Sequence, residues 1–236
     1  MNRSQARLTD DFAPPPFAGF SPAAFSFFRG LAENQSKAWF EANREVYENQ
    51  VRAPMASLVV DVAARLGTRG LHFAGDPKRA IFRLNRDVRF SNDKSPYKTN
   101  AGAAMTRDGG KMSPGVLYIH VGAEDCFTAA GFYRPEPPAL QAMREMIVRD
   151  FAGWKRATKN LDLSRDDALA KPPKGFLAEN AEIAEALKLK SWVVRRPLAM
   201  QDMRGPGLVD VITEFAVAAG PLLKFGWSAL EKRKVS

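Results

Sequence analysis

The most regular alternation of apolar and polar positions in the chain runs from Ala80 to Phe90. At a period of two, the residues of this stretch fall on two faces. One face is mostly polar and carries Ile81, Arg83, Asn85, Asp87 and Arg89; the other is apolar and carries Phe82, Leu84, Val88 and Phe90. The β-branched and aromatic residues favour a strand. A helix is the alternative, because it would place Arg83 and Asp87 one turn apart.

Arg86 does not fit this alternation, because a straight strand would direct it into the apolar face. A bulge near Asn85 would turn the side chain outward. Alternatively, Arg86 is buried and paired with Asp87, Asp93 or an acid elsewhere, since a buried charge needs a partner.

The rest of the pattern predicts an α+β fold. Apolar residues recur at helical spacing from Ser21-Pro22 to Gly67 with a break or restart at Pro54, then over residues 137–151 and 181–189, and again from Leu208. Strands are predicted at residues 101–105, 116–121, 126–132 and 192–196, and Asp108-Gly109-Gly110 is a hairpin turn signal. We therefore expect N-terminal helices, a mainly antiparallel sheet in the middle and C-terminal helices packed on it. Gly220-Pro221 is expected to kink or stop the last helix.

The domain organisation follows from composition. Residues 1–19 are proline-rich and unpatterned, which predicts a disordered or loosely attached tail. Residues 20–236 contain no repeat and no linker rich enough to divide them, and they are expected to form a single domain. No window approaches the roughly 20 apolar residues of a membrane helix, so no membrane association is expected.

Positive charge is concentrated around the alternating stretch. The net charge is +9, and the segment from Lys78 to Lys111 holds nine basic and three acidic residues. Concentrated basic charge attracts phosphates, other anions or nucleic acid. A solvated basic face that only aids solubility is the alternative.

The residue types in this segment suit the binding of an anion. Arginines grip phosphate or carboxylate groups in bidentate fashion, and aspartates among them hold guanidinium groups in place. The polar turn at residues 91–96 leads to Tyr97 and Lys98, and the predicted helix before it presents Asn43 and Tyr47 one turn apart. The candidate ligand-binding residues are Arg83, Arg86, Asp87, Arg89, Asp93, Lys94, Tyr97, Lys98, Asn43 and Tyr47. If the site were catalytic, Asp87 or Asp93 would be the base in a reaction at a phosphate ester.

The sequence gives little support for a metal site, a catalytic nucleophile or a nucleotide-binding loop. Two histidines and one cysteine offer no zinc spacing, and neither a nucleophile elbow nor a nucleotide-binding glycine motif occurs, so no metal and no cofactor is expected. His120, in step with Tyr118, is expected to be packed in a strand. Cys126 is expected to be a buried thiol, and a single cysteine favours the reducing cytoplasm.

The central motif resembles that of domain-of-unknown-function family 2461, found in bacteria and fungi. The matching residues are Arg83-x-x-Arg86-Asp87-x-Arg89-Phe90 and Asp93-Lys94-x-x-Tyr97-Lys98, with Trp39-Phe40, Asn43, Tyr47, Gly131-Phe132-Tyr133-x-Pro135 and Pro173-Lys174-Gly175-Phe176. The resemblance covers most of the chain from about Phe20. It implies no activity, because the family has none assigned, and no residue receives a role from it.

Three hypotheses follow, in order of preference. The first is a pocket for a small phosphate or carboxylate ligand, with or without catalysis. The second is a nucleic-acid-binding protein that stacks bases on Phe82, Phe90 and Tyr97. The third is a structural or interaction protein whose arginine–aspartate network only holds the fold.

Overall fold

The structure, a computed structural model, describes residues 14–89, 92–110, 113–176 and 180–233. Their helices and strands follow in chain order as α1 Pro22–Glu33, α2 Lys37–Ala42, α3 Arg44–Val46, η1 Tyr47–Arg52, α4 Ala53–Thr68, α5 Pro77–Ala80, β1 Asn100–Thr106, β2 Val116–Gly122, β3 Cys126–Phe132, α6 Pro137–Arg149, α7 Phe151–Ala157, α8 Ala181–Leu187, β4 Trp192–Pro197, α9 Met200–Met203 and α10 Leu208–Arg233. The element η1 is a π-helical stretch.

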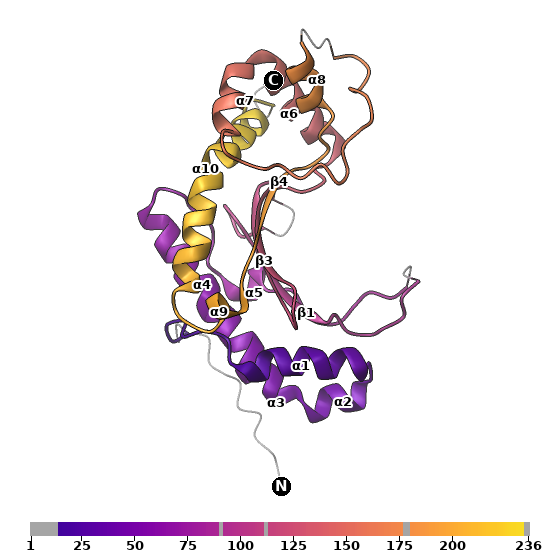
Figure 1. Cartoon of the computed structure of the whole chain (residues 1–236), viewed down its shortest axis with the longest axis vertical. Helices are drawn as coiled ribbons and strands as arrows, with labels where there is room; N and C mark the ends of the chain where they lie inside the picture. Colours follow the sequence, from indigo (N-terminus) through magenta and orange to yellow (C-terminus); the bar gives the residue numbers. More distant parts are fainter. Residues whose placement is uncertain (1–13, 90–91, 111–112, 177–179, 234–236) are drawn as a thin grey trace.

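A four-stranded antiparallel sheet forms the centre of the molecule (Figure 1). Its spatial order β1-β2-β3-β4 repeats the chain order, so neighbouring strands pair in sequence. The α+β class, with helices before and after a central antiparallel sheet, is confirmed. The four strands predicted at residues 101–105, 116–121, 126–132 and 192–196 are present, and β3 begins and ends at the predicted residues.

One face of the sheet is packed and the other is open. Along β2, Leu117, Ile119 and Val121 are buried, whereas Tyr118 and His120 between them are half-buried. Helices α10 and α4 pack on the buried face, and α10 contacts both β3 and α4 (Figure 1). Tyr118 and His120 therefore lie on the open face of the sheet, away from α10.

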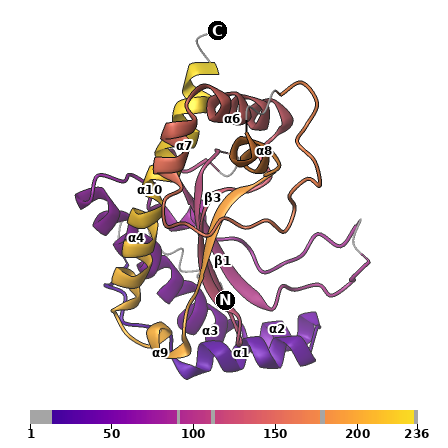
Figure 2. The same ribbon diagram turned by 45° about the horizontal axis from the view of Figure 1, so that its top comes forward.

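Helices also cover the two ends of the sheet (Figures 1 and 2). Helices α1, α2 and α3 lie at one end, and α6, α7 and α8 lie at the other. The second group packs through an aromatic cluster in which Trp192 of β4 lies 4.5 Å from Trp154 and 6.1 Å from Phe225 between ring centroids.

The regular strand predicted at residues 80–90 is wrong. Helix α5 ends at Ala80, and the residues that follow form one side of a projecting two-stranded loop, residues 81–99, which we call the arm (Figures 1 and 2). The described residues of the arm form only isolated bridges, Ile81 with Ala103 of β1 and Asn85 with Tyr97. The ladder stops because the arm leaves the edge of the sheet and because Pro96 has no N–H to donate.

The arm nevertheless keeps the predicted alternation of exposure. Leu84 is buried, while Arg83, Asn85, Asp87 and Arg89 are exposed. Three backbone hydrogen bonds hold its base, from Phe82 N to Gly102 O (2.9 Å), from Lys98 N to Leu84 O (2.8 Å) and from Arg86 N to Pro96 O (2.9 Å). Phe90, one of the predicted stacking residues, lies outside the described residues.

Three further predictions need correction. The predicted tail at residues 1–19 is too long at its C-terminal end, because Phe17 is buried and its N–H donates to Asp61 Oδ2 at 2.8 Å; residues 1–13 lie outside the described residues. The helix predicted over residues 137–151 divides at Asp150, whose carboxylate accepts from Gly153 N and caps α7. Helix α10 does not stop at Gly220-Pro221, because Pro221 lies inside it.

No helix within the described residues combines the length and the apolar character that a membrane span requires.

Candidate anion-binding site

A cavity of about 880 Å³ lies between the base of the arm and the helical segment α2–η1. We call it the basic pocket. It is lined by six basic, two acidic and several aromatic side chains among Lys37, Phe40, Glu41, Arg44, Tyr47, Glu48, Arg52, Pro77, Lys78, Ile81, Phe82, Arg83, Leu84, Asn85, Tyr97 and Lys98.

The helical wall of the basic pocket is a single row of charges. Lys37, Glu41, Arg44, Glu48 and Arg52 recur every three or four residues, which places them along one face of consecutive helical turns. Arg44 binds Glu41 at 2.6 Å, and Arg52 binds Glu48 at 3.0 Å. Both acidic side chains of the pocket are therefore already paired with arginines of their own wall.

The π-helical stretch η1 supplies three of the residues in this wall, Tyr47, Glu48 and Arg52. Such stretches are rare and often lie at functional sites, because the extra residue in the turn re-aims the side chains that follow. Tyr47 is buried among aromatic rings, and this burial raises the pKa of its hydroxyl.

The arm is anchored to the helical wall by Tyr97. Its ring stacks on Phe40 of α2 with centroids 4.7 Å apart, and its backbone N–H donates to Gln35 Oε1 at 3.1 Å. This contact fixes the next residue, Lys98, at the rim of the basic pocket. Opposite it in the arm, Leu84 O accepts from Lys98 N, which places Arg83 beside Lys98.

Lys98 carries its charge in unfavourable surroundings. Burial lowers the pKa of its ammonium group, and the nearby charges of Arg83 and Arg86 lower it further. Lys98 Nζ lies 5.3 Å from the centroid of the Phe82 ring. In the described part of the chain, neither Lys98 nor Arg83 has an ion-pair partner. Two adjacent cations thus face the cavity without a counter-charge.

The structure brings four of the ten sequence-predicted residues to the basic pocket: Tyr47, Arg83, Tyr97 and Lys98. Asn43 instead closes the end of α2, where its side-chain amide donates to Trp39 O at 2.9 Å. Lys94 donates to Val88 O at 3.0 Å within the arm.

The other four residues form two ion pairs in the outer part of the arm. Arg86, 31% exposed, binds Asp93, one of the partners expected for it. Arg89, 76% exposed, binds Asp87 through both oxygens at 3.0 and 2.7 Å. The three arginines of the motif therefore do not converge on one cavity.

Asp93 organises the turn of the arm. Hydrogen bonds from Ser95, together with the Arg86 guanidinium, lower the pKa of the Asp93 carboxyl to about 2. Arg89 likewise lowers the pKa of Asp87. Neither carboxylate lines the basic pocket, and strongly stabilised carboxylates are poor proton acceptors at neutral pH.

Sequence reasoning found Tyr47 in the helical wall of the basic pocket but missed the cations of that wall. Lys37, Arg44 and Arg52 occur in a regular row of alternating charges that is typical of a solvated helix face. Lys78 precedes the motif, at the start of α5. Only the fold of the arm against α2 shows that these cations and Arg83 line one cavity.

Among the described residues, no cluster of three or more histidine, cysteine, aspartate or glutamate side chains is arranged to hold a metal ion.

Comparison with known proteins returned no match among curated proteins and none among solved structures. One family model matches residues 23–225, which is most of the chain and includes the arm, the helical wall and the sheet. Its description is conserved hypothetical protein, and by this match the chain belongs to the DUF2461 family.

Proposed function

We propose that the protein binds a small anionic ligand, a phosphate or a carboxylate, in the basic pocket. The observation that supports this most directly is the pair Arg83 and Lys98, which line an open cavity and have no ion-pair partner among the described residues. The acidic side chains of the cavity, Glu41 and Glu48, are held by Arg44 and Arg52. An anion would supply the missing counter-charge.

Electrostatic energy favours an anion in the basic pocket. Two like charges on neighbouring side chains repel each other, and partial burial strengthens the repulsion by lowering the local dielectric constant. A bound phosphate or carboxylate replaces this repulsion with charge-assisted hydrogen bonds, which contribute about 1.5–3 kcal/mol each. A cation, by contrast, would have to displace an existing ion pair to reach either carboxylate.

Nucleic acid fits the structure less well. Tyr97 is buried against Phe40, so its ring offers no free face for base stacking. The outer arm, residues 86–95, holds three basic and two acidic residues and is almost neutral. The positive charge is gathered at the base of the arm.

The purely structural hypothesis accounts for only part of the motif. The pairs Arg86–Asp93 and Arg89–Asp87 hold the outer arm together, as a structural network would. Arg83 and Lys98 make no such pair within the described residues, and their repulsion costs stability. We therefore assign structure to the outer arm and ligand binding to its base.

We also propose a cytoplasmic location. Cys126, the only cysteine in the sequence, is buried, and burial raises the pKa of its thiol. A reduced thiol of this kind suits a compartment that keeps cysteines reduced.

The proposal is tested by thermal unfolding in the presence of inorganic phosphate, sulfate and citrate. A ligand at 100 times its Kd stabilises a protein by about 2.7 kcal/mol, which for a chain of this size raises Tm by about 5–10 °C. Arg83→Ala should weaken binding of the effective anion by about tenfold or more, the equivalent of about 1.4 kcal/mol.

Arg89→Ala is the matched control, because it removes the same side chain from the same arm but outside the basic pocket. It should leave the affinity for the anion unchanged. The proposal is wrong if none of the three anions raises Tm, or if both variants weaken binding equally, as they would for a diffuse surface effect.

A further inference from the structure

A second, smaller cavity of about 290 Å³ lies beside the basic pocket, on the open face of the sheet. We call it the sheet pocket. It is lined by Phe82, Lys98, Asn100, Gly102, Tyr118 and His120. Phe82 and Lys98 line both cavities, so the two cavities are adjacent.

The polar groups of the sheet pocket are not satisfied by one another. Tyr118 Oη and Asn100 Nδ2 both approach the same atom, His120 Nδ1, each at 3.4 Å. A ring nitrogen of histidine offers one lone pair or one N–H, so it can serve only one of these two groups. Both distances also lie beyond the usual hydrogen-bond length. At least one polar group is therefore available to a ligand.

The walls that hold these groups are well defined. The imidazole of His120 stacks on Phe127 of β3, with centroids 4.5 Å apart and planes at 15°. Tyr118 reaches across β1 because Gly102 has no side chain there, since a Cβ at Gly102 would lie 2.7 Å from Tyr118 Oη. Burial lowers the pKa of His120, which keeps the imidazole neutral at pH 7, with one donor and one acceptor nitrogen.

We propose that the sheet pocket is a subsite for the hydroxyl-bearing end of the ligand whose anionic group occupies the basic pocket, so that the ligand is a phosphorylated or carboxylated polyol, such as a sugar phosphate. Lys98, at the junction, would contact both ends. This inference rests on the proposed function and adds the class of molecule to it.

The chemistry of the lining selects hydroxyl groups. Tyr118 Oη, the Asn100 amide and the neutral His120 ring each both donate and accept hydrogen bonds, as a hydroxyl group does. A second charged group would instead have to be desolvated beside a neutral imidazole. Phe82 adds an apolar surface that suits the C–H face of a sugar ring.

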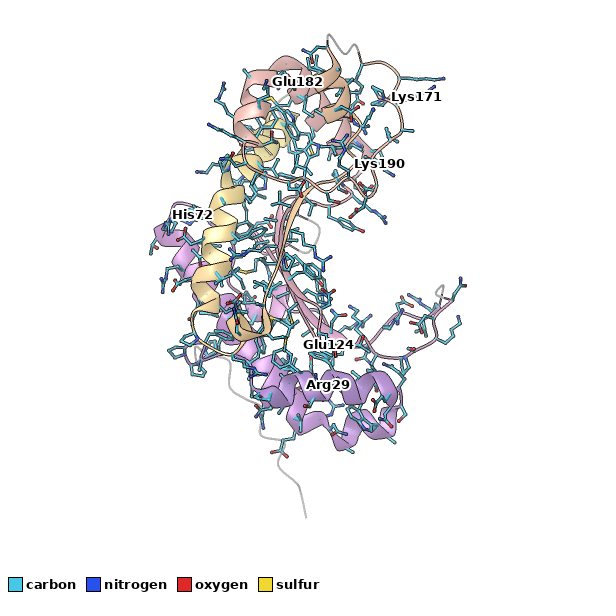
Figure 3. All side chains as sticks on the ribbon, viewed as in Figure 1. Arg29, His72, Glu124, Lys171, Glu182 and Lys190 are labelled. Atoms are coloured by element: carbon cyan, nitrogen blue, oxygen red, sulfur yellow. The ribbon has the colours of Figure 1, made fainter. Side chains whose placement is uncertain are left out.

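The experiment uses the two histidines of the chain as reporters. Imidazole signals of His120 and His72 are followed by NMR while inorganic phosphate, glucose, glucose 6-phosphate, ribose 5-phosphate or glycerol 3-phosphate is added. His72 is the internal control, because it is exposed and lies beside α10, on the side of the sheet away from the arm (Figure 3). His120→Phe assigns the signals and retains an aromatic ring against Phe127.

At least one sugar or polyol phosphate should shift the His120 signal, leave His72 unmoved and bind about tenfold more tightly than phosphate, an advantage of about 1.4 kcal/mol. Tyr118→Phe, which removes one oxygen and keeps the ring, should reduce this advantage while leaving the affinity for phosphate itself unchanged.

The two proposals fail separately. If phosphate binds through Arg83 but no polyol phosphate moves the His120 signal, the subsite is wrong and the anion site stands. The subsite is equally wrong if Tyr118→Phe weakens phosphate and polyol phosphate by the same factor. If phosphate does not bind and glucose alone moves His120, the anion site is wrong and the hydroxyl subsite stands; if no probe binds, both are wrong.

Discussion

Lys98 lines both cavities, and no ion-pair partner among the described residues compensates its charge. A lysine in water loses little by carrying a proton, but burial and the neighbouring charges of Arg83 and Arg86 make protonation of Lys98 more costly. Because the same charge that is costly in the empty pocket is attractive to an anion, binding and protonation of Lys98 must support each other.

This linkage predicts how anion binding depends on pH. We use sulfate, whose charge is constant above neutral pH. Because the pKa of Lys98 is lowered, the ammonium group begins to lose its proton below the ordinary pKa of lysine, and sulfate affinity should fall as pH rises through that range. Isothermal titration between pH 7 and pH 10.5 measures the fall.

Lys98→Met is the control for this prediction, because it keeps the length of the side chain without the charge. It should bind sulfate more weakly at pH 7 and lose the part of the pH dependence that Lys98 causes. Superimposable pH profiles for the two proteins would show that Lys98 does not contact the anion.

At the scale of elements, local patterns predicted the sheet well. Strands β1 to β4 are short alternating segments bounded by turns such as Asp108-Gly109-Gly110, so their nature is set by neighbours in sequence. The arm has the same alternation but lies beyond the sheet edge. The alternation alone does not show whether a neighbouring strand is present for pairing. The regular strand predicted at residues 80–90 was wrong for that reason.

The basic pocket was harder to predict than the sheet because its two walls come from distant parts of the sequence. The arm wall was recognised through Arg83, Tyr97 and Lys98, where unusual residue types occur close together. Of the helical wall only Tyr47 was recognised, since the charged row from Lys37 to Arg52 looks like any solvated helix face. The stacking of Tyr97 on Phe40 joins them, and that contact spans 57 residues of chain.

Gly131 in β3 gives a prediction about the close approach of β3 and β4. Its φ is +137°, and a Cβ added there would lie 1.9 Å from Trp192 O in the paired strand β4. Gly131→Ala should therefore lower the free energy of unfolding by about 3 kcal/mol or more, because it combines backbone strain with a clash against backbone. Urea denaturation measures the loss.

Gly175→Ala separates these two causes. Gly175 also has a positive φ, +86°, but no described heavy atom lies within 4 Å of the position of an added Cβ. Its substitution should cost only about 1 kcal/mol, from the backbone conformation alone. Equal losses in the two variants would mean that β4 moves away from β3 and that the close approach at Gly131 is not required.

At the scale of the whole molecule, the outer part of the arm and its base make different contacts. Within the described residues, the side chains of the outer arm bond to one another: Arg86 to Asp93, Arg89 to Asp87, and Lys94 to Val88 O. The base of the arm instead contacts β1, through Ile81 and Ala103, and α2, through Tyr97 and Phe40. The outer arm is therefore a self-contained unit, whereas the base belongs to the sheet and the helical wall.

This division predicts that the outer arm can be removed without loss of the basic pocket. Replacing residues 86–96 with Asn-Gly, a favoured two-residue hairpin turn, joins the bridged residues Asn85 and Tyr97 directly. Tm should stay within about 2 °C of the original, because no described side chain of this segment belongs to the core. Sulfate affinity at pH 7 should persist, since Arg83 and Lys98 remain. Without Arg86, one of the charges that lower the pKa of Lys98 is gone, so the fall in affinity should move to higher pH.

The same shortened protein shows whether the arginines of the outer arm or the cations at its base bind the anion. If sulfate binding disappears while Tm is unchanged, the anion is held by Arg86 and Arg89 of the outer arm, not by Arg83 and Lys98. If sulfate binding persists and its pH profile shifts upward as expected, the outer arginines serve the arm itself, and the unpaired cations at its base hold the anion.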